Sequence, residues 1–367
     1  MPRVSRRIRM MEEVPDVPQE VRDYLYSKLA ESPEGWEKTW EEFRTSINGI
    51  IDVIGEKEFY PLIDDIFNAY HLVKPKDVRV VIIGQDPYHQ LVKIGRKQMP
   101  RAVGLSFSVR EKDVIPQSLA SLFKELKRDL GKEFTTPKSG DLSNWCKQGV
   151  MLLNRSLMVE PNKAGSVDPI LWQTLLTNTI SQIQKHNKKC IYVLWGKKAQ
   201  AIGKFIPSSA IRLTADHPSG LAVAARARNP GGGTPFIGCG HFSEVNRLFK
   251  EIMRDDVVKK MRELKIKHIK EVSKNLSLHK LREVLIPEDF AEIVKIMDSP
   301  KYDPINWNLD YVPLERPRKI YEVYEDKDET KEEPSEEPEQ EESSEEESKI
   351  EDSSHYVPWK SRVVAME

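Results

Sequence analysis

Four short stretches of nearly continuous apolar residues stand out along the chain, and polar residues follow each of them closely. Strands show this pattern when both faces of their sheet are covered. Between the stretches, apolar residues recur every three or four positions, which is the period of a helix with one buried face. The alternation predicts strands at 78–83, 150–153, 189–195 and 210–215, and helices at 118–130, 169–186, 197–205 and 243–254.

Alternating strands and helices predict the α/β class, with a central four-stranded parallel sheet flanked by helices in an α/β/α sandwich. In such a sheet the carboxyl ends of the strands meet at one edge, and ligands bind beyond that edge. Polar residues follow every predicted strand there: GQDPYH (84–89), Asn154, Gly196-Lys197 and His217-Pro218-Ser219. The sequence therefore predicts a polar site at this edge.

The remaining regions differ in composition. Residues 1–35 are polar and partly basic, and we expect a flexible N-terminal segment. Residues 251–302 are rich in Lys and Glu with a helical period, so we expect a helical insertion or extension of the domain at 36–250. Residues 303–320 are expected to return and pack on that domain. Residues 321–367 contain too little apolar surface for a core, which predicts a disordered acidic tail with a short terminal motif.

Charge is divided unevenly along the chain. Residues 325–352 carry 16 Asp or Glu and 3 Lys, a net charge of −13, so the rest of the chain carries +12. A basic body with an acidic tail is typical of proteins that bind nucleic acid. Ordinary surface charge would give the same counts, so composition leaves both interpretations open.

Several signals bear on location and cofactors. We expect no membrane helix, because no run of 18 apolar residues occurs, and no secretory signal, because MPRVSRRIRM lacks an apolar core. Three widely spaced cysteines, Cys146, Cys190 and Cys239, indicate a reducing compartment and exclude a self-contained four-cysteine metal cluster. We expect the nucleus or a viral replication compartment, and neither a metal nor a cofactor.

Six motifs occur in an ordered set: GQDPYH (84–89), GLSFSV (104–109), GDLSNWCKQGVMLLN (140–154), VLWG (193–196), HPSGL (217–221) and GCGHFSEVN (238–246). In this order they resemble the family 1 uracil-DNA glycosylases. The resemblance covers about 36–250, the expected catalytic domain, and resumes at 304–307. It implies a monofunctional glycosylase that flips uracil out of DNA and hydrolyses its N-glycosidic bond, which starts base excision repair.

The resemblance assigns catalytic roles to two residues. Asp86 would position the hydrolytic water and stabilise the cationic sugar, and His217, as a neutral imidazole, would donate a hydrogen bond to uracil O2 as charge moves onto the base. Asn154 would pair with N3–H and O4 of uracil and reject cytosine, which presents the opposite pattern. The base-binding site would be completed by Gln85, acting largely through its backbone, by Tyr88, which excludes the thymine methyl group, and by Phe107, which stacks on uracil.

Phe107 could instead simply pack in the core, since GLSFSV is also typical of a strand. For DNA, the resemblance makes Leu221 an apolar wedge inserted from the minor groove. The phosphates would be held near Pro116 and Ser118, at a helix start, and near Ser219 and Gly220.

The sequence also departs from the family. Gly220 stands where the family usually has proline, so we expect a more flexible wedge loop. The loops 90–103 and 222–237 are longer and basic, and we expect their cations to contact the DNA backbone. Lys197 stands where a small hydroxyl residue is common and would make an ionic phosphate contact. The cations expected in the long loops are Lys93, Arg96, Lys97, Arg226 and Arg228.

The sequence is also compatible with two other functions. The chain could be a DNA-binding replication accessory module on the same fold with weak or lost catalysis, or it could act on another mismatched or damaged pyrimidine. Expected partners are uracil-containing single- and double-stranded DNA, with a protein partner conceivable through the acidic tail or residues 251–302. We expect a monomer.

Overall fold

The computed structural model describes residues 17–55, 57–220, 233–266, 269 and 276–310. Two compact units are present. The first contains the described residues up to Val245 together with those from Ile305 onward, and the second spans Asn246–Pro304. The site lies in the first unit.

The first unit is built on a parallel sheet of four strands in the order β4-β1-β5-β6. These strands are β1 (Val80–Gly84), β4 (Val150–Asn154), β5 (Ile191–Trp195) and β6 (Ile211–Ala215). All residues of β1, β4 and β5 are buried, whereas the edge strand β6 is buried only in part. The predicted α/β fold with its four-stranded parallel sheet is confirmed, and the apolar runs of the sequence correspond to strands covered on both faces.

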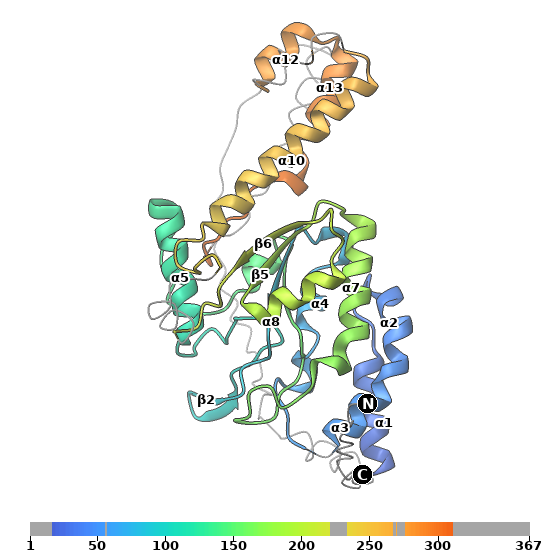
Figure 1. Ribbon diagram of the computed structural model, residues 1–367, viewed down its shortest axis with the longest axis vertical. Coiled ribbons are helices and arrows are strands. Elements are labelled where there is room, and N and C mark those ends of the chain that lie inside the picture. The colour runs from blue at the N-terminus through green and yellow to red at the C-terminus, as the bar shows by residue number, and fades with distance from the viewer. Residues whose placement is uncertain (1–16, 56, 221–232, 267–268, 270–275, 311–367) are drawn as a thin grey trace, which may run out of the picture. The chain divides into compact units, whose positions relative to one another are not determined.

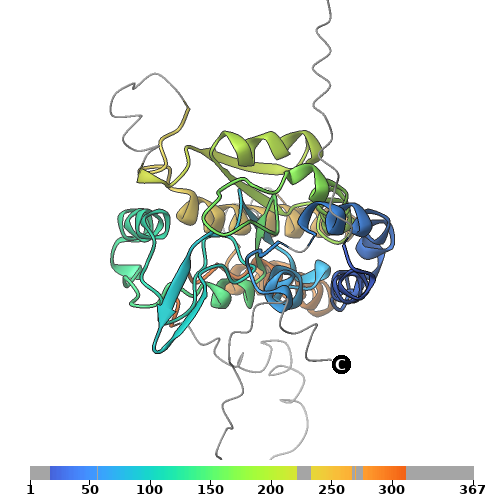
Figure 2. The same cartoon turned by 90° about the horizontal axis from the view of Figure 1, so that it is seen from below.

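Helices flank this sheet, and Figures 1 and 2 show α5 and α7 on opposite sides of the strands. On α5, a buried stripe of Leu119, Leu122, Phe123 and Leu126 faces inward, as its helical period predicts. Shorter helices surround the strands and connect them to the rest of the unit. The helices of this part are α2 (Glu37–Phe43), α3 (Ile47–Ile54), α4 (Asn68–Leu72), α5 (Gln117–Leu130), α6 (Ser143–Cys146), α7 (Gln173–His186) and α8 (Lys197–Gln200).

The folded unit begins earlier than the sequence suggested. Helix α1 (Gln19–Ala30) buries Val21, Leu25 and Leu29. The indole Nε1 of Trp40 donates a hydrogen bond to the carbonyl oxygen of Leu29, with 3.1 Å between the atoms. The expectation of a flexible segment up to residue 35 was therefore wrong for 17–35, because the three buried residues of α1 are spread among many polar ones and give a weak periodic signal. Residues 1–16 lie outside the described part.

Two local structures differ from the sequence-based expectation. Part of the long loop 90–103 forms an antiparallel hairpin of β2 (Leu91–Ile94) and β3 (Lys97–Pro100), with Gly95 at positive φ in its turn. GLSFSV is not a strand, since Gly104 and Phe107 have φ angles of 72° and 64°. Ser106 joins the sheet only locally, because its N–H donates to Leu152 O and its hydroxyl to Ile82 O.

The described end of the chain, from Ile305, packs within the first unit. The carbonyl oxygen of Trp307 accepts a hydrogen bond from the indole of Trp145 at 2.9 Å. The Trp307 ring packs edge-on against Trp145 and Phe242, with centroid distances of 5.1 and 5.0 Å. Residues 311–320 of the expected return segment lie outside the described residues, as do the acidic tail and the terminal motif.

The second unit has a small core of its own, formed by Val257, Met261, Leu281 and Ile293. Helix α10 (His241–Glu263) supplies the first two of these from the part that belongs to this unit. The helices α12 (Leu278–Val284) and α13 (Pro287–Met297) supply the others. The helical period in 251–302 thus corresponds to helices that bury one face against each other.

No helix in the described ranges is both long and apolar enough to cross a membrane.

Candidate active site

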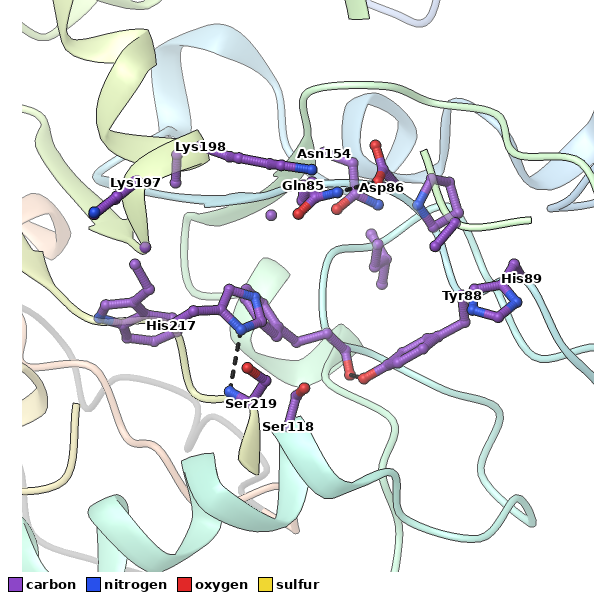
Figure 3. Close-up of a pocket in the computed structure, with 18 of the residues that line it drawn as sticks. Gln85, Asp86, Tyr88, His89, Ser118, Asn154, Lys197, Lys198, His217 and Ser219 are labelled. Carbon is purple, nitrogen blue, oxygen red and sulfur yellow. Dashed lines mark hydrogen bonds between the residues drawn. The ribbon is translucent and has the colours of Figure 1, made fainter. Parts of the chain in front are cut away.

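A pocket of about 600 Å³ opens at the carboxyl ends of the strands. Figure 3 shows side chains from the ends of β1, β4 and β6 and from the start of α5 converging on it. The pocket brings together most of the residues predicted from the sequence. Those on its wall are Gln85, Asp86, Tyr88, Phe107, Ser118, Asn154, His217 and Ser219.

Some of the residues predicted to contact DNA lie within the described part of the chain, and others do not. Pro116 is the N-cap residue of α5, and Gly220 directly follows Ser219 of the pocket wall. Leu221 and Arg226 lie outside the described residues, so the wedge and the second basic loop stay predictions. Among the residues that the structure does describe, no cluster of three or more His, Cys, Asp or Glu side chains is arranged to hold a metal ion.

Asp86 is held by its neighbour in sequence. The side-chain amide of Gln85 donates a hydrogen bond to Oδ2 of Asp86. Burial raises the pKa of Asp86 above its ordinary value, while the Gln85 hydrogen bond and the positive charges of Lys198 and Arg155 oppose the shift. The carboxylate is therefore oriented in a partly desolvated pocket, where a fixed charge acts strongly on a reacting group.

The side chain of Gln85 was not expected to have this role. The backbone carbonyl oxygen of Gln85 accepts hydrogen bonds from the N–H groups of Arg155 and Ser156, at 3.1 and 3.2 Å. These bonds tie the segment after β1 to the segment after β4, and they leave the side chain to orient Asp86.

His217 has a defined tautomer. The N–H of Ser219 donates to Nδ1 of His217 at 3.1 Å, so the proton of the neutral ring lies on Nε2. Burial lowers the pKa of His217, and the charge of Lys198 lowers it further. Gly196 lets the ring approach, because a Cβ at this position would lie 2.9 Å from His217 Cβ. The lowered pKa favours the neutral imidazole, which retains one N–H donor on Nε2.

The pairing of β4 with β1 positions Asn154. As the last residue of β4, it lies opposite Gly84, the last residue of β1. A Cβ at Gly84 would come within 2.2 Å of Oδ1 of Asn154, so only glycine leaves room for this amide. Asn154 is 6% exposed, and a buried amide at a pocket wall can select a ligand by its donor and acceptor pattern.

A hydrogen bond connects Tyr88 to Phe107. The phenol of Tyr88 donates a hydrogen bond to the carbonyl oxygen of Phe107 at 3.2 Å, and burial keeps the pKa of Tyr88 far above neutrality. The ring of Phe107 lies 5.9 Å from the His217 ring and 5.6 Å from that of Trp195. Phe107 is both buried and on the pocket wall, so packing in the core and facing a bound ring are compatible roles.

The loop after His217 contacts the start of α5. A Cβ at Gly220 would lie 2.1 Å from the amide nitrogen of Gln117, the first residue of α5. The space that a larger residue would occupy at 220 is therefore filled by the Gln117 side chain. The flexible wedge loop expected from Gly220 stays a prediction, because residues 221–232 lie outside the described part.

Two lysines follow β5, and sequence reasoning weighed only the first. Figure 3 shows Lys198 extending toward Gln85 and Asn154, whereas Lys197 points away from the pocket centre. The run Gly196-Lys197-Lys198 was a visible signal, but the direction of each side chain depends on how α8 starts. Arg155, whose charge acts on Asp86, was also missed, because a single Arg after a strand is unremarkable in sequence.

The fold and the pocket define a class: a parallel α/β protein with an acid, an amide and a neutral imidazole at the carboxyl edge of its sheet. Residues 71–250 match the sequence profile described as the uracil DNA glycosylase superfamily. A uracil-DNA glycosylase of Glaesserella parasuis is 44% identical over 191 residues, which is 52% of this chain and 78% of that protein. The chain therefore belongs to the uracil-DNA glycosylase superfamily.

Other relatives agree. A uracil-DNA glycosylase of Chromobacterium violaceum is 44% identical over 191 residues, covering 52% of this chain and 72% of that protein. The crystal structure of mimivirus uracil-DNA glycosylase has the same fold, with a TM-score of 0.50 and 22% identity over 64% of this chain and 84% of that one. A variant of the mimivirus enzyme in complex with UGI gives a TM-score of 0.51 at 23% identity, covering 61% of this chain and 87% of that chain.

Proposed function

We propose that the chain is a family 1, monofunctional uracil-DNA glycosylase, which hydrolyses the N-glycosidic bond of uracil in DNA and leaves an abasic site. The observation that carries this proposal is the meeting of Asp86, Asn154 and His217 at one pocket. They come from three different strand ends, and their chemistry matches the reaction. Membership of the superfamily supports the same activity.

The reaction separates charge, and Asp86 suits the cationic sugar while His217 suits the anionic base. As the glycosidic bond breaks, the sugar becomes cationic and the base anionic. The carboxylate of Asp86 stabilises the cationic sugar and orients the attacking water. The Nε2–H of His217 donates to O2 of the departing base, and its neutral state suits donation without full proton transfer.

Base selection follows from the wall of the pocket. The amide of Asn154 accepts from N3–H and donates to O4 of uracil, whereas cytosine would leave this buried amide unpaired. Tyr88 excludes the thymine methyl group, and the ring of Phe107 stacks on the base. Reaching this pocket requires the nucleotide to leave the helix, because the bond is hidden within a stacked duplex.

The accessory-module alternative has less support. A protein that only binds DNA has no need for an oriented carboxylate, a neutral imidazole and a buried amide at one pocket. The other alternative, a different damaged pyrimidine, is disfavoured by the donor and acceptor pattern of Asn154 and by Tyr88 at the wall.

Uracil-containing single- and double-stranded DNA is the proposed substrate, handled by a monomer in the nucleus or a viral replication compartment. The basic body supports DNA binding, and we include Leu221 as the wedge and Ser118 and Ser219 as phosphate contacts. The acidic tail, 325–352, is proposed to compete with DNA for the basic surface. If a chain lacking 325–352 binds DNA at low salt with unchanged affinity, the tail has no such role. The second unit remains a candidate surface for a protein partner.

Base release tests the function directly. Oligonucleotides carrying one uracil, one thymine or one cytosine are incubated with the protein in EDTA, and free base is measured. We expect release of uracil alone, and Asp86→Asn should reduce it by about 100- to 1000-fold. Asn154→Asp should gain some release of cytosine. Tight DNA binding with no release of any base would overturn the proposal in favour of the accessory module.

A further inference from the structure

The two lysines at the start of α8 differ in where they point. Lys197 and Lys198 are consecutive, both exposed and both on the pocket wall, but Figure 3 shows the side chain of Lys198 extending toward Gln85 and that of Lys197 running the other way. Consecutive residues on a helix point about 100° apart, so one of a pair can face a site while the other faces solvent. Lys198 therefore brings a positive charge to the pocket wall near Gln85.

This charge lies within electrostatic reach of both reacting groups. Burial raises the pKa of Asp86, and Lys198 is among the groups that lower it again. Burial lowers the pKa of His217, and Lys198 adds to this effect. Lys198 lies on the wall of the same pocket as Asp86 and His217, and this pocket is the space that a flipped nucleotide would fill.

The negatively charged phosphodiesters of the substrate favour a cation near Asp86. A nucleotide entering the pocket carries its base inward and its phosphodiesters at the rim, where the carboxylate of Asp86 would repel them. An exposed ammonium group stays hydrated and makes a point contact with a phosphate at little desolvation cost. A base buried inside the pocket would be reached only by dehydrating the lysine, so the phosphate is the better partner.

We propose that Lys198 is a substrate-binding residue that contacts a phosphodiester of the flipped uracil nucleotide and offsets its repulsion by Asp86. This inference rests on the proposed function. It predicts a contact that forms only when a nucleotide is flipped, in addition to the contacts that hold the rest of the strand. Lys198 would therefore strengthen binding to uracil-containing DNA more than binding to undamaged DNA.

The test compares Lys198→Met and Lys198→Arg with Lys188→Met. Lys188 is an exposed lysine just before β5, at the opposite edge of the sheet, so this control removes the same charge away from the pocket. Binding is measured over a salt series with two duplexes, one with 2′-fluoro-2′-deoxyuridine, whose fluorine slows bond cleavage, and one with thymine at the same position. Uracil release by each variant is measured separately.

We expect Lys198→Met to weaken binding of the duplex with 2′-fluoro-2′-deoxyuridine by roughly tenfold. The slope of log K against log salt concentration for this duplex should become shallower by about 0.9, the value for one neutralised phosphate. Binding of the thymine duplex should match that of Lys188→Met, and Lys198→Arg should keep the slope. Equal effects of Lys198→Met and Lys188→Met on both duplexes would overturn the inference. So would slower release with unchanged affinity and slope, since the charge would then act on the base. If the wild type released no uracil, the proposed function would fail, while the binding comparison would still test Lys198.

Discussion

The backbone N–H of Ser219 donates a hydrogen bond to Nδ1 of His217, with 3.1 Å between the nitrogens, as Figure 3 shows. This single bond determines which ring nitrogen carries the proton. It comes from backbone, so it does not depend on which side chain is present at position 219. Together with the burial that lowers the pKa of His217, it presents a neutral ring with its N–H on Nε2. Nitrogen-15 NMR of the imidazole at pH 7 should show the Nε2–H tautomer, and a doubly protonated ring would contradict this assignment.

The rate of uracil release should fall only on the acid side of its pH profile. The reaction needs Asp86 ionised and His217 neutral, and both conditions fail as the pH falls. The raised pKa of Asp86 places its limb above the ordinary range of aspartates, whereas the lowered pKa of His217 places its limb below the ordinary histidine value. We expect kcat/KM for uracil release to stay level from roughly pH 7 to 9 and to fall on acidification. A second limb in which activity falls above neutrality would contradict these assignments.

The same carboxylate should cost stability at neutral pH. A folded-state pKa of Asp86 above its unfolded value means that the protonated form is favoured by folding, so this contribution is present at acid pH and lost as the pH rises through the folded pKa. Asp86→Asn should therefore melt at a higher temperature than the wild type at neutral pH, and the difference should shrink on acidification. Equal melting temperatures at all pH values would show that burial of Asp86 carries no such cost.

Tyr88 allows its hydroxyl and its ring to be tested separately. Tyr88→Phe removes only the hydrogen bond to Phe107 O, a loss of about 1 kcal/mol in stability, and should keep thymine excluded. Tyr88→Ala removes the ring that fills the space beside the base and should permit slow release of thymine. The assay is base release from thymine-containing oligonucleotides. Thymine release by Tyr88→Phe but not by Tyr88→Ala would refute exclusion by the ring.

Gln117 and Gly220 should behave as a coupled pair. Gly220→Ala would place a methyl group where the Gln117 amide now lies, so the side chain must move away. Gln117→Ala clears that space, and the double variant should cost less than the two single variants together, by roughly 0.5–1 kcal/mol. Denaturant unfolding of the four proteins measures the coupling. Additivity to within about 0.3 kcal/mol would mean that Gln117 does not restrain this loop.

Among the cations expected to contact the DNA backbone, those of the β2–β3 hairpin lie within the described residues. Lys93 and Arg96 are exposed on it, and a two-stranded ribbon can approach a duplex closely. Lys93→Met with Arg96→Met should reduce the salt slope of binding to undamaged DNA by about 0.9 for each phosphate that these side chains neutralise. Lys188→Met is again the matched control. If the slope of the double variant equals that of the control, the hairpin does not touch the DNA backbone.

Much of the fold could be predicted from the sequence, because its signals are local. The strands of the sheet are short apolar runs, and α5 shows its buried stripe at the helical period. Parallel strands end at one edge, which sufficed to expect Asp86, Asn154 and His217 together. The resemblance of the ordered motifs to a glycosylase family then supplied roles for these side chains.

Other features depended on contacts between segments far apart in the chain. The positive φ angles of GLSFSV arise where this segment crosses β1 and β4, and the hairpin depends on how β2 and β3 align. Helix α1 is held by buried contacts that its sparse apolar pattern barely indicates.

The sequence by itself determined the order of the elements, the edge at which the site forms and the kinds of side chain that meet there. Only the tertiary structure decided that Ser219 selects the His217 tautomer, that Gln117 fills the space beside Gly220, and that Lys198 rather than Lys197 extends toward Gln85. The physical reason is that periodicity records burial along one element. The direction of a side chain and the identity of its partner depend instead on the elements packed around it.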